Sequence, residues 1–333
     1  MKILYVNNYF ADKSSFDACI NGEWSLAHTW GGDMLYKTSG VHFSFESSQH
    51  IAKRKNRVLR LMLTLFFQFK LLLKYYDYDC VYGACAHCVD IFGLGKKLNF
   101  FKGILIAIIH HPTKILLSKH YDLLVCFSKY TYNLLVSRYP FANICYKFWG
   151  PHIPFYEAIK SKLDNDTINE HYDFFSNGKS FRDFPILEQA LIETNYTALV
   201  IRHGNAASKN MLCKDARTQS ESLKFSNRCK VMIVPVIKQK GVCGVTSIND
   251  ALGMGMPILL SSSCNLGFDP QEQGIGYVYE AGNVDDLKDK MRLILQDEVL
   301  HKLKQSLSHF RERNDYIHFS KFIYDFVMGK CKI

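Results

Sequence analysis

Short apolar runs recur along the first half of the chain, and each is followed by a segment that can form a helix. They occupy residues 3–6, 80–82, 104–109 and 123–127. Continuous apolar runs of this length are typical of strands buried on both faces, and their alternation with helices predicts a parallel sheet covered by helices. Residues 8–33, which are polar and aromatic, are expected to form a long loop after the first strand.

The pattern breaks at residues 149–154, where two prolines and a glycine stand within six positions. This composition disfavours both a helix and a central strand, so we expect a junction between domains here. The pattern then restarts, with Asp183 available to cap the first helix. Strands are predicted at 172–176, 198–202, 231–234, 258–260 and 275–279, and helices at 185–193, 246–254, 283–307 and 316–327.

The chain therefore reads as an α/β protein with two doubly wound, Rossmann-like halves. We expect domains at 1–150 and 151–312, with 313–333 forming a helix that packs back on the first domain. In open α/β sheets, ligands bind beyond the carboxyl ends of the strands. Two such sheets facing a cleft would hold both substrates between them.

Composition agrees with a globular protein, because 48% of the 333 residues are hydrophobic and 22% are charged. No stretch reaches the ~18 uncharged apolar residues of a spanning helix, and the first ten residues lack a signal-peptide pattern. We therefore expect a cytoplasmic protein. The eleven cysteines are scattered, which in a reducing compartment favours buried thiols over disulfides.

The formal net charge of +10 suits an anionic partner. Residues 51–74 hold seven Lys or Arg and no acid, densely interleaved with Leu, Met and Phe. Two interpretations stay open: a long helix packed on the sheet with a basic outer face, or a helix that binds an anionic membrane surface. No nucleic-acid-recognition motif is present, so nucleic acid is not an expected partner.

Residues 244–257 carry the most specific chemistry. Gly244 allows close approach of a ligand to the backbone, and the following helix start offers N–H groups to a diphosphate. Thr246 and Ser247 add hydroxyl donors, and Asp250, one turn further on, can accept from ribose hydroxyls. The alternative is a simple capped helix beside a strand.

This segment resembles the donor-binding signature of GT-B glycosyltransferases, with an acid, Ala and Leu at 250–252 and Gly-Met-Pro at 255–257. The resemblance implies a hexosyl transfer from a nucleotide-sugar, most commonly a UDP-sugar, without a metal ion. The acceptor would be a hydroxyl of a glycan or a lipid-linked molecule, in surface polysaccharide synthesis. The enzyme would then be cytoplasmic, peripheral on the inner face of the membrane.

Other pieces of the same pattern follow in order. Gly178, Lys179 and Arg182 resemble the loop that binds the donor diphosphate, although two solvated surface cations are the alternative. The segment 274–287 is similar to a later element of the donor domain, and 148–156 is similar to the interdomain linker. His110 and His111 end a strand where such enzymes often carry a histidine.

The chain departs from the pattern at one position. Retaining members often carry two acids eight residues apart, and the first would fall at Val242. Inverting and retaining mechanisms both stay open. The candidates for a general base are Glu23, Asp17, His28 and His111, each with an ordinary surface side chain as its alternative. The missing acid also keeps a second function open: a catalytically silent partner subunit that binds a nucleotide-sugar.

Cys85 and Cys88 form a lone C-x-x-C pair. No second pair completes a zinc site, and the thioredoxin-like context of a redox motif is absent. We expect buried or incidental cysteines.

Overall fold

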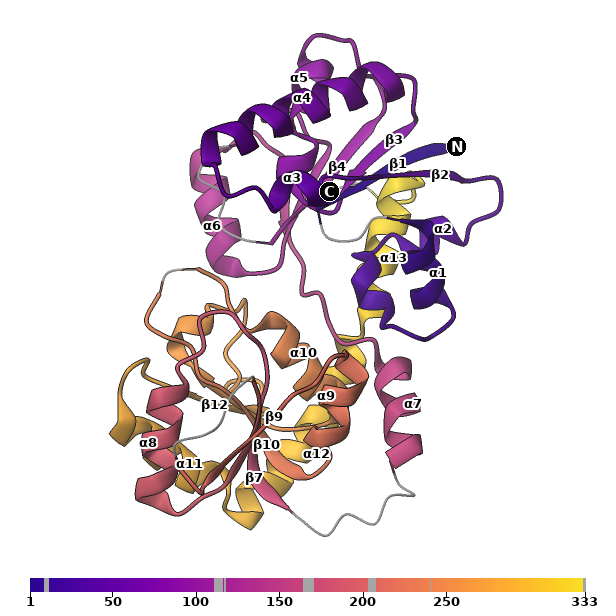
Figure 1. Cartoon of the computed structure of the whole chain (residues 1–333). Helices are drawn as coiled ribbons and strands as arrows, with labels where there is room; N and C mark the ends of the chain where they lie inside the picture. The colour runs from indigo at the N-terminus through magenta and orange to yellow at the C-terminus, as the bar shows by residue number, and fades with distance from the viewer. Residues whose placement is uncertain are drawn as a thin grey trace. The chain divides into compact units, whose positions relative to one another are not determined.

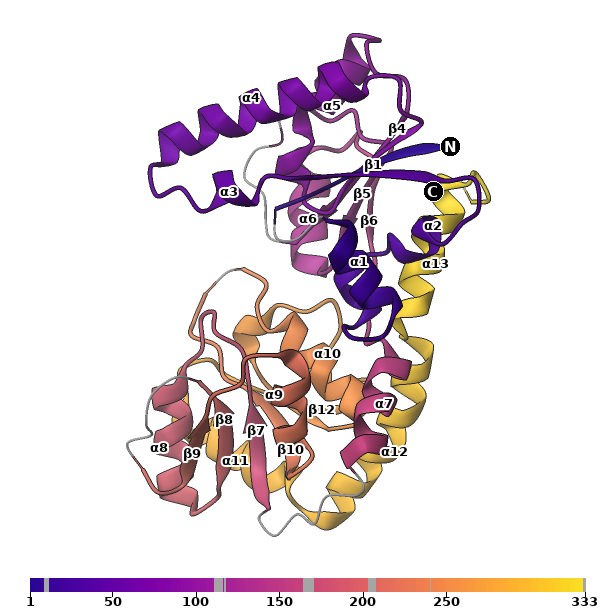
Figure 2. The ribbon, with the colours of Figure 1, turned by 45° about the vertical axis from the view of Figure 1, so that its right-hand side comes forward.

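A computed structural model describes residues 1–8, 12–110, 116, 118–163, 171–202, 208–239 and 241–331. Its contacts divide the chain into two compact units. Unit 1 comprises Met1–Trp149 and Tyr316–Ile333, and unit 2 comprises Gly150–Asp315. Figures 1 and 2 show a sheet flanked by helices in each unit.

Unit 1 is built on a six-stranded sheet in which every pair is parallel. The four central strands confirm the four apolar runs of the sequence. The edge strands β2 and β6, which are only partly buried, were not predicted. In spatial order the strands are β2 (His42–Ser47), β1 (Lys2–Asn7), β3 (Cys80–Gly83), β4 (Ile104–Ile109), β5 (Leu123–Cys126) and β6 (Ile144–Tyr146).

The helices of unit 1 pack on its sheet and on one another, and residues 57–75 confirm the long basic helix. The carboxyl half of α4 buries Leu71, Leu72 and Tyr75 in the aliphatic core, where α5 is its neighbour. The helices are α1 (Lys13–Ile20), α2 (Asp33–Tyr36), α3 (Gln49–Ala52), α4 (Arg57–Tyr75), α5 (Asp90–Lys97), α6 (Lys129–Arg138) and α13 (Tyr316–Val327), with 3₁₀ turns η1 (Leu26–Thr29) and η2 (Ala86–Cys88).

A cluster of aromatic rings joins β1, β2 and β3 to α1 and α2. Tyr5 stacks on Tyr82 at a centroid distance of 5.3 Å and meets the edge of Phe16 at 4.8 Å. Phe16 lies on α1, so the prediction of a continuous loop over 8–33 is wrong. Asp12 caps this helix by accepting from the Ser15 backbone N–H, and Phe16, one of the aromatic residues of this segment, is a buried core residue.

The last helix, α13, is fixed to unit 1 by a buried carboxylate, as expected for 313–333. Asp33 accepts from the Tyr316 hydroxyl at 2.6 Å and from Ser320 at 2.8 Å. The Tyr316 oxygen also accepts from the Gly31 N–H at 2.7 Å. Gly31 has φ +91, and a Cβ there would lie 2.9 Å from Ile323 on α13. The two ends of unit 1 in sequence therefore share one core.

Unit 2 repeats the architecture. Its spatial order is β12 (Gly276–Tyr279), β11 (Ile258–Ser261), β10 (Cys229–Val234), β7 (Tyr172–Ser176), β8 (Ala198–Ile201) and β9 (Met211–Lys214), again all parallel. Its helices are α7 (Ile153–Leu163), α8 (Phe184–Thr194), α9 (Gln219–Ser226), α10 (Val245–Met254), α11 (Val284–Ile294) and α12 (Asp297–Arg313), with the 3₁₀ turn η3 (Ser262–Cys264).

Two groups of helices cover this sheet. α8 and α11 contact each other and share a core with Phe174, Val231 and Leu259. α7, α9 and α10 contact one another, as Figure 2 also shows. The Asp183 side chain accepts from the Ile186 N–H, which confirms the predicted cap of α8. Two Rossmann-like units of this kind are the fold class expected from the sequence.

The segment at 149–154 is only partly irregular. Gly150 to His152 have no regular structure, but α7 begins at Ile153 and contains Pro154 in its first turn. Proline is tolerated there because the first turn has no internal partner for its missing N–H. The expectation that the whole segment is non-helical is therefore wrong after His152.

Candidate functional site

The loop after β7 in unit 2 brings a positive charge to the amino end of α10. Gly178 has φ +97, a backbone conformation that favours glycine, and a Cβ there would meet the Arg182 guanidinium. Arg182 folds back across this loop. Its Nε donates to the Asn177 carbonyl at 2.9 Å, and Nη2 donates to Ser247 Oγ at 2.8 Å.

The Arg182 charge has no carboxylate partner among the described residues. Its remaining hydrogen bonds go to the Ser180 carbonyl and to the Cys243 sulfur, which are neutral. Ser247 Oγ donates in turn to the Asn177 carbonyl at 3.2 Å. The guanidinium is therefore held in place by neutral groups, and its charge is left to act on a ligand.

The amino end of α10 lacks a side-chain cap from any part of the chain that the structure describes. Its first position is preceded by Gly244, which has φ +86 and whose Cβ would lie 2.8 Å from Val234. Uncapped N–H groups and the positive end of the helix dipole favour an anion. The sequence prediction placed a glycine and a helix start here, and the structure has both.

Asp250 is 5% exposed and accepts hydrogen bonds from three separate elements. Oδ1 accepts from Tyr156 of α7 at 3.0 Å and from Gln219 of α9 at 2.7 Å. Oδ2 accepts from Asn177, which follows β7, at 2.8 Å. Burial raises the pKa of Asp250 to about 6, and the three donors counteract that rise.

Two buried polar atoms beside this network have no hydrogen-bond partner among the described residues. They are the Ser176 hydroxyl and Asn177 Oδ1, both at the carboxyl end of β7. Buried polar groups are ordinarily satisfied, so an orphaned pair at this edge of a sheet is consistent with a ligand or water completing the site.

The remaining predicted donor residues are less constrained. Lys179 and Thr246 are exposed, and neither side chain makes a hydrogen bond or ion pair within the described ranges. Val242 is buried, so the position of the missing acid contributes no charge. Sequence reasoning missed Asn177, Tyr156 and Gln219 as partners of Asp250, because an isolated amide or phenol gives no local signal until its partner is known.

The proposed bases lie in unit 1, except His111, which lies outside the described residues. Asp17 on α1 accepts from the Tyr36 hydroxyl at 2.8 Å. Glu23 is exposed and His28 is half-buried in η1. The neighbouring His110 is held by the Ala84 carbonyl at 2.6 Å and meets the edge of the Trp30 ring. These contacts group none of the candidates into a catalytic pair.

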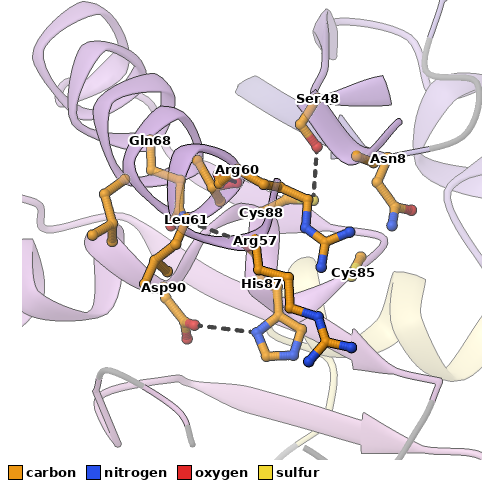
Figure 3. Close-up of a pocket in the computed structure, with 13 residues that line it drawn as sticks. Asn8, Ser48, Arg57, Arg60, Leu61, Gln68, Cys85, His87, Cys88 and Asp90 are labelled. Carbon is orange, nitrogen blue, oxygen red and sulfur yellow. Dashed lines mark hydrogen bonds and ion pairs between the residues drawn. The ribbon is translucent and has the colours of Figure 1, made fainter. Parts of the chain in front are cut away.

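Unit 1 also contains a cavity of about 600 Å³ at the carboxyl ends of β1 and β3. Figure 3 shows Arg57 and Arg60 extending from α4 on the side where Asn8, Cys85 and His87 lie. The thirteen lining residues are Asn8, Ser48, Ala52, Arg57, Arg60, Leu61, Thr64, Leu65, Gln68, Cys85, His87, Cys88 and Asp90. The sequence indicated the basic helix but gave no sign that two of its arginines face a cavity.

Among the described residues, no group of three or more His, Cys, Asp or Glu is arranged to hold a metal ion. Within those ranges, no helix combines the length and the apolar character needed to cross a bilayer.

The fold is shared with several solved glycosyltransferase structures. The Anabaena protein Alr3699/HepE in complex with UDP superposes with a TM-score of 0.68 at 12% identity, covering 99% of this chain and 100% of its own. A glycosyltransferase from Rickettsia africae ESF-5 gives 0.62 at 14%, covering 99% of both chains. An α,α-trehalose-phosphate synthase (UDP-forming) from Burkholderia vietnamiensis gives 0.73 at 9%, covering 98% of both.

No protein-family model and no curated protein sequence matches this chain. At these identities the superpositions establish the architecture alone. Over nearly its full length, the chain has the GT-B fold of two Rossmann-like domains that the sequence predicted.

The buried Asp250 carboxyl makes stability depend on pH in a defined direction. Unfolded, it titrates near its ordinary pKa of about 4; folded, near about 6. Between these values the unfolded chain binds fewer protons, so stability falls as pH rises. One unit of pKa corresponds to about 1.4 kcal/mol, and the unfolded carboxyl is already half ionised at pH 4. The wild type should therefore lose about 2 kcal/mol relative to Asp250→Asn between pH 4 and pH 7.

Urea denaturation followed by circular dichroism at each pH measures this difference. Asp289→Asn, at an exposed carboxylate of unit 2, is the matched control and should leave the pH dependence of the wild type unchanged. If the free energy of unfolding depends on pH equally in the wild type and Asp250→Asn, Asp250 does not have the raised pKa.

Proposed function

We propose that this protein is a glycosyltransferase that moves a hexose from a UDP-sugar to a hydroxyl of a glycan or lipid-linked acceptor, in surface polysaccharide synthesis. The observation that carries the proposal is the Arg182 guanidinium, which has no carboxylate partner among the described residues and lies beside the uncapped start of α10. A charge and a helix N-terminus at the carboxyl ends of parallel strands suit the diphosphate of a nucleotide.

The remaining donor contacts are assigned to neighbouring groups. Lys179 and Thr246 are exposed and adjoin Arg182 and Ser247 in sequence, so we assign them to the diphosphate as well. Asp250 Oδ2 accepts from Asn177 and retains the capacity to accept from a ribose hydroxyl. Its second task in the proposal is to orient Asn177 and Gln219.

The known structures of the same fold support a nucleotide-sugar. Complexes of HepE hold UDP with glucose, and UDP-glucose. Another structure of this fold is the lipopolysaccharide outer core galactosyltransferase WaaB. The ligands and the name of these proteins motivate UDP as the first nucleotide to test and a surface glycan as the acceptor class.

The reaction forms one bond and breaks one. An acceptor oxygen bonds to the anomeric carbon as the bond from that carbon to the diphosphate oxygen breaks. The hydroxyl proton goes to a base, for which Glu23, Asp17, His28 and His111 are the candidates, and UDP leaves with the bonding electrons. Arg182 and the α10 N–H groups stabilise the charge that develops on the diphosphate, so no metal ion is required in this scheme.

A second function follows from Val242. This buried, uncharged side chain occupies the position of the first acid of the retaining pair. A subunit that binds a nucleotide-sugar without turning it over would tolerate this residue. Release of UDP from UDP-sugars in the presence of acceptor lipid separates an enzyme from such a subunit.

We further propose that α4 rests on an anionic membrane surface, on the cytoplasmic side. Val58, Met62 and Phe66 are 69%, 63% and 69% exposed, while the segment 51–74 carries only positive charges. Large apolar side chains that stay exposed beside Lys and Arg are typical of interfacial helices.

Arg182→Ala should weaken UDP binding by about 2 kcal/mol, or about thirtyfold in Kd, because charge-assisted hydrogen bonds to phosphate are lost. Arg182→Lys keeps the charge but not the bidentate geometry, so its Kd for UDP should lie between those of the wild type and Arg182→Ala. Isothermal titration calorimetry measures both, and Arg292→Ala on the outer surface of α11 is the control. Equal affinity in Arg182→Ala and the wild type would refute the donor site.

Reversing three charges with Lys53→Glu, Arg54→Glu and Lys55→Glu should weaken sedimentation with phosphatidylglycerol-containing vesicles by about a hundredfold, since each cation contributes about 1 kcal/mol. The matched triple variant Lys302→Glu, Lys304→Glu and Arg313→Glu, on α12 of unit 2, should bind like the wild type. If both triple variants lose binding equally, the interaction depends on net charge and not on the basic segment 51–74.

A further inference from the structure

Two arginines share one wall of the unit 1 cavity without a counterion. Arg57 and Arg60 are three residues apart on α4, so their side chains lie on neighbouring positions of one helix face. Both are exposed, and neither guanidinium has a hydrogen bond or ion pair within the described residues. Like charges at this spacing are mildly destabilising, which an anionic ligand would relieve.

The carboxylate that lines the same cavity already has contacts with other residues. Asp90 is buried, accepts from the Tyr121 hydroxyl at 2.5 Å and lies 3.8 Å from His87 Nδ1. The nearby Asp90 carboxylate raises the pKa of His87. The cavity therefore presents two guanidinium groups and a histidine whose neighbour favours its cationic form.

The walls of this cavity are held in position. The Gln68 side chain donates to the His87 carbonyl at 2.9 Å and accepts from the Ile91 N–H at 2.9 Å. These two bonds tie α4 to the segment that carries η2 and α5. On the opposite wall, Ser48 lies 3.3 Å from the Cys88 sulfur, as the dashed line in Figure 3 marks. These contacts fix the position of α4, which carries both arginines, beside the cavity.

The rim of the cavity continues into the exposed apolar face of α4. Leu61 and Leu65 line the cavity. Met62 stands one position from Leu61 and three from Leu65, and Phe66 follows Met62 by one turn. A ligand whose charged group contacts Arg57 and Arg60 would therefore have an apolar surface available to a hydrocarbon chain at the rim.

We propose that this cavity binds the phosphate-bearing headgroup of a lipid-linked acceptor, with Arg57 and Arg60 on the phosphate and the hydrocarbon chain along Leu61, Met62 and Phe66. This inference rests on the proposed glycosyl transfer and names its acceptor class. Paired guanidinium groups suit phosphate oxygens geometrically. A volume of about 600 Å³ lies within the range of specific small-molecule sites.

Cys85 supplies a local reporter for the test. It lines the cavity and is half-buried, and a hydrogen bond from the Cys88 thiol lowers the pKa of Cys85 to about 7 against the opposing effect of burial. Iodoacetamide alkylates thiolates, so a ligand in the cavity should slow the alkylation of Cys85. Peptide mapping by mass spectrometry measures this rate, with the half-buried Cys145 and Cys213 as internal controls.

The probe is decyl phosphate below its micellar concentration, compared with inorganic phosphate and the neutral decyl glucoside. Decyl phosphate should slow the alkylation of Cys85 about tenfold, since hydrogen bonds between charged groups contribute more than neutral ones. At the same concentration, inorganic phosphate and decyl glucoside should each have little effect. Cys145 and Cys213 should react at unchanged rates.

The matched variants remove two charges each. Arg57→Gln with Arg60→Gln should abolish the protection of Cys85 by decyl phosphate, whereas Lys53→Gln with Lys55→Gln should retain it, because neither lysine lines the cavity. Both double variants should bind UDP like the wild type. UDP binding separates the donor site of unit 2 from the acceptor cavity of unit 1. If the wild type does not bind UDP, the donor site is refuted, and the protection of Cys85 by decyl phosphate is unaffected.

Three results would overturn the inference. Equal protection by decyl glucoside would show that the phosphate is not recognised. Equal protection by inorganic phosphate would show a site for free phosphate and not for a lipid-linked one. Equal loss of protection in both double variants would show attraction to net charge.

Discussion

A carboxylate buried in unit 2 needs hydrogen-bond donors around it, and the residues that supply them organise the candidate nucleotide-sugar site. Asp250 on α10 is reached by Tyr156 from α7, Gln219 from α9 and Asn177 from the end of β7. A single acidic side chain thus connects three helices with the sheet edge. The backbone carbonyl of Asn177 then receives Arg182, which links the carboxylate network to the guanidinium that we assign to the diphosphate.

The same constraint changes the role of Asp250. From the sequence, its place one turn after Thr246 indicated an acceptor for ribose hydroxyls. In the structure, its two oxygens already accept three hydrogen bonds, and its pKa is raised by burial. A residue in such a position acts first on the geometry of its neighbours. Contacts with a nucleotide would then be shared between this carboxylate and the groups it orients.

The central strands were predictable because they are buried on both faces and therefore read as continuous apolar runs. The edge strands β2, β6 and β9 were not predicted, because solvent on one side permits polar residues such as Ser44, Tyr146 and Lys214. The last edge strand, β12, was predicted since its flanking glycines mark its ends. α1 was missed because its core contact is chiefly Phe16 and Cys19, which is too short a pattern to show helical periodicity.

Site residues were predictable where a local rule applies. Gly178 and Gly244 stand at positive φ beside a strand end and a helix start, which is a recognisable arrangement. The partners of Asp250 and the cavity beside α4 depend on contacts between segments far apart in sequence. Asn177 lies 73 positions from Asp250 and Tyr156 lies 94, and no local spacing encodes such pairs.

The structure also shows where some of the positive charges of the chain lie. Arg57 and Arg60 face a cavity, whereas Lys74 at the other end of α4 pairs with Glu46 at 3.0 Å. The carboxyl half of α4 therefore packs in the core, whereas its amino half is exposed and available to a ligand or a membrane surface. Hydrogen–deuterium exchange with and without UDP tests the central claim most directly. The account predicts protection of the peptides that cover 177–182 and 244–250 in unit 2; no protection there, or protection confined to unit 1, would contradict it.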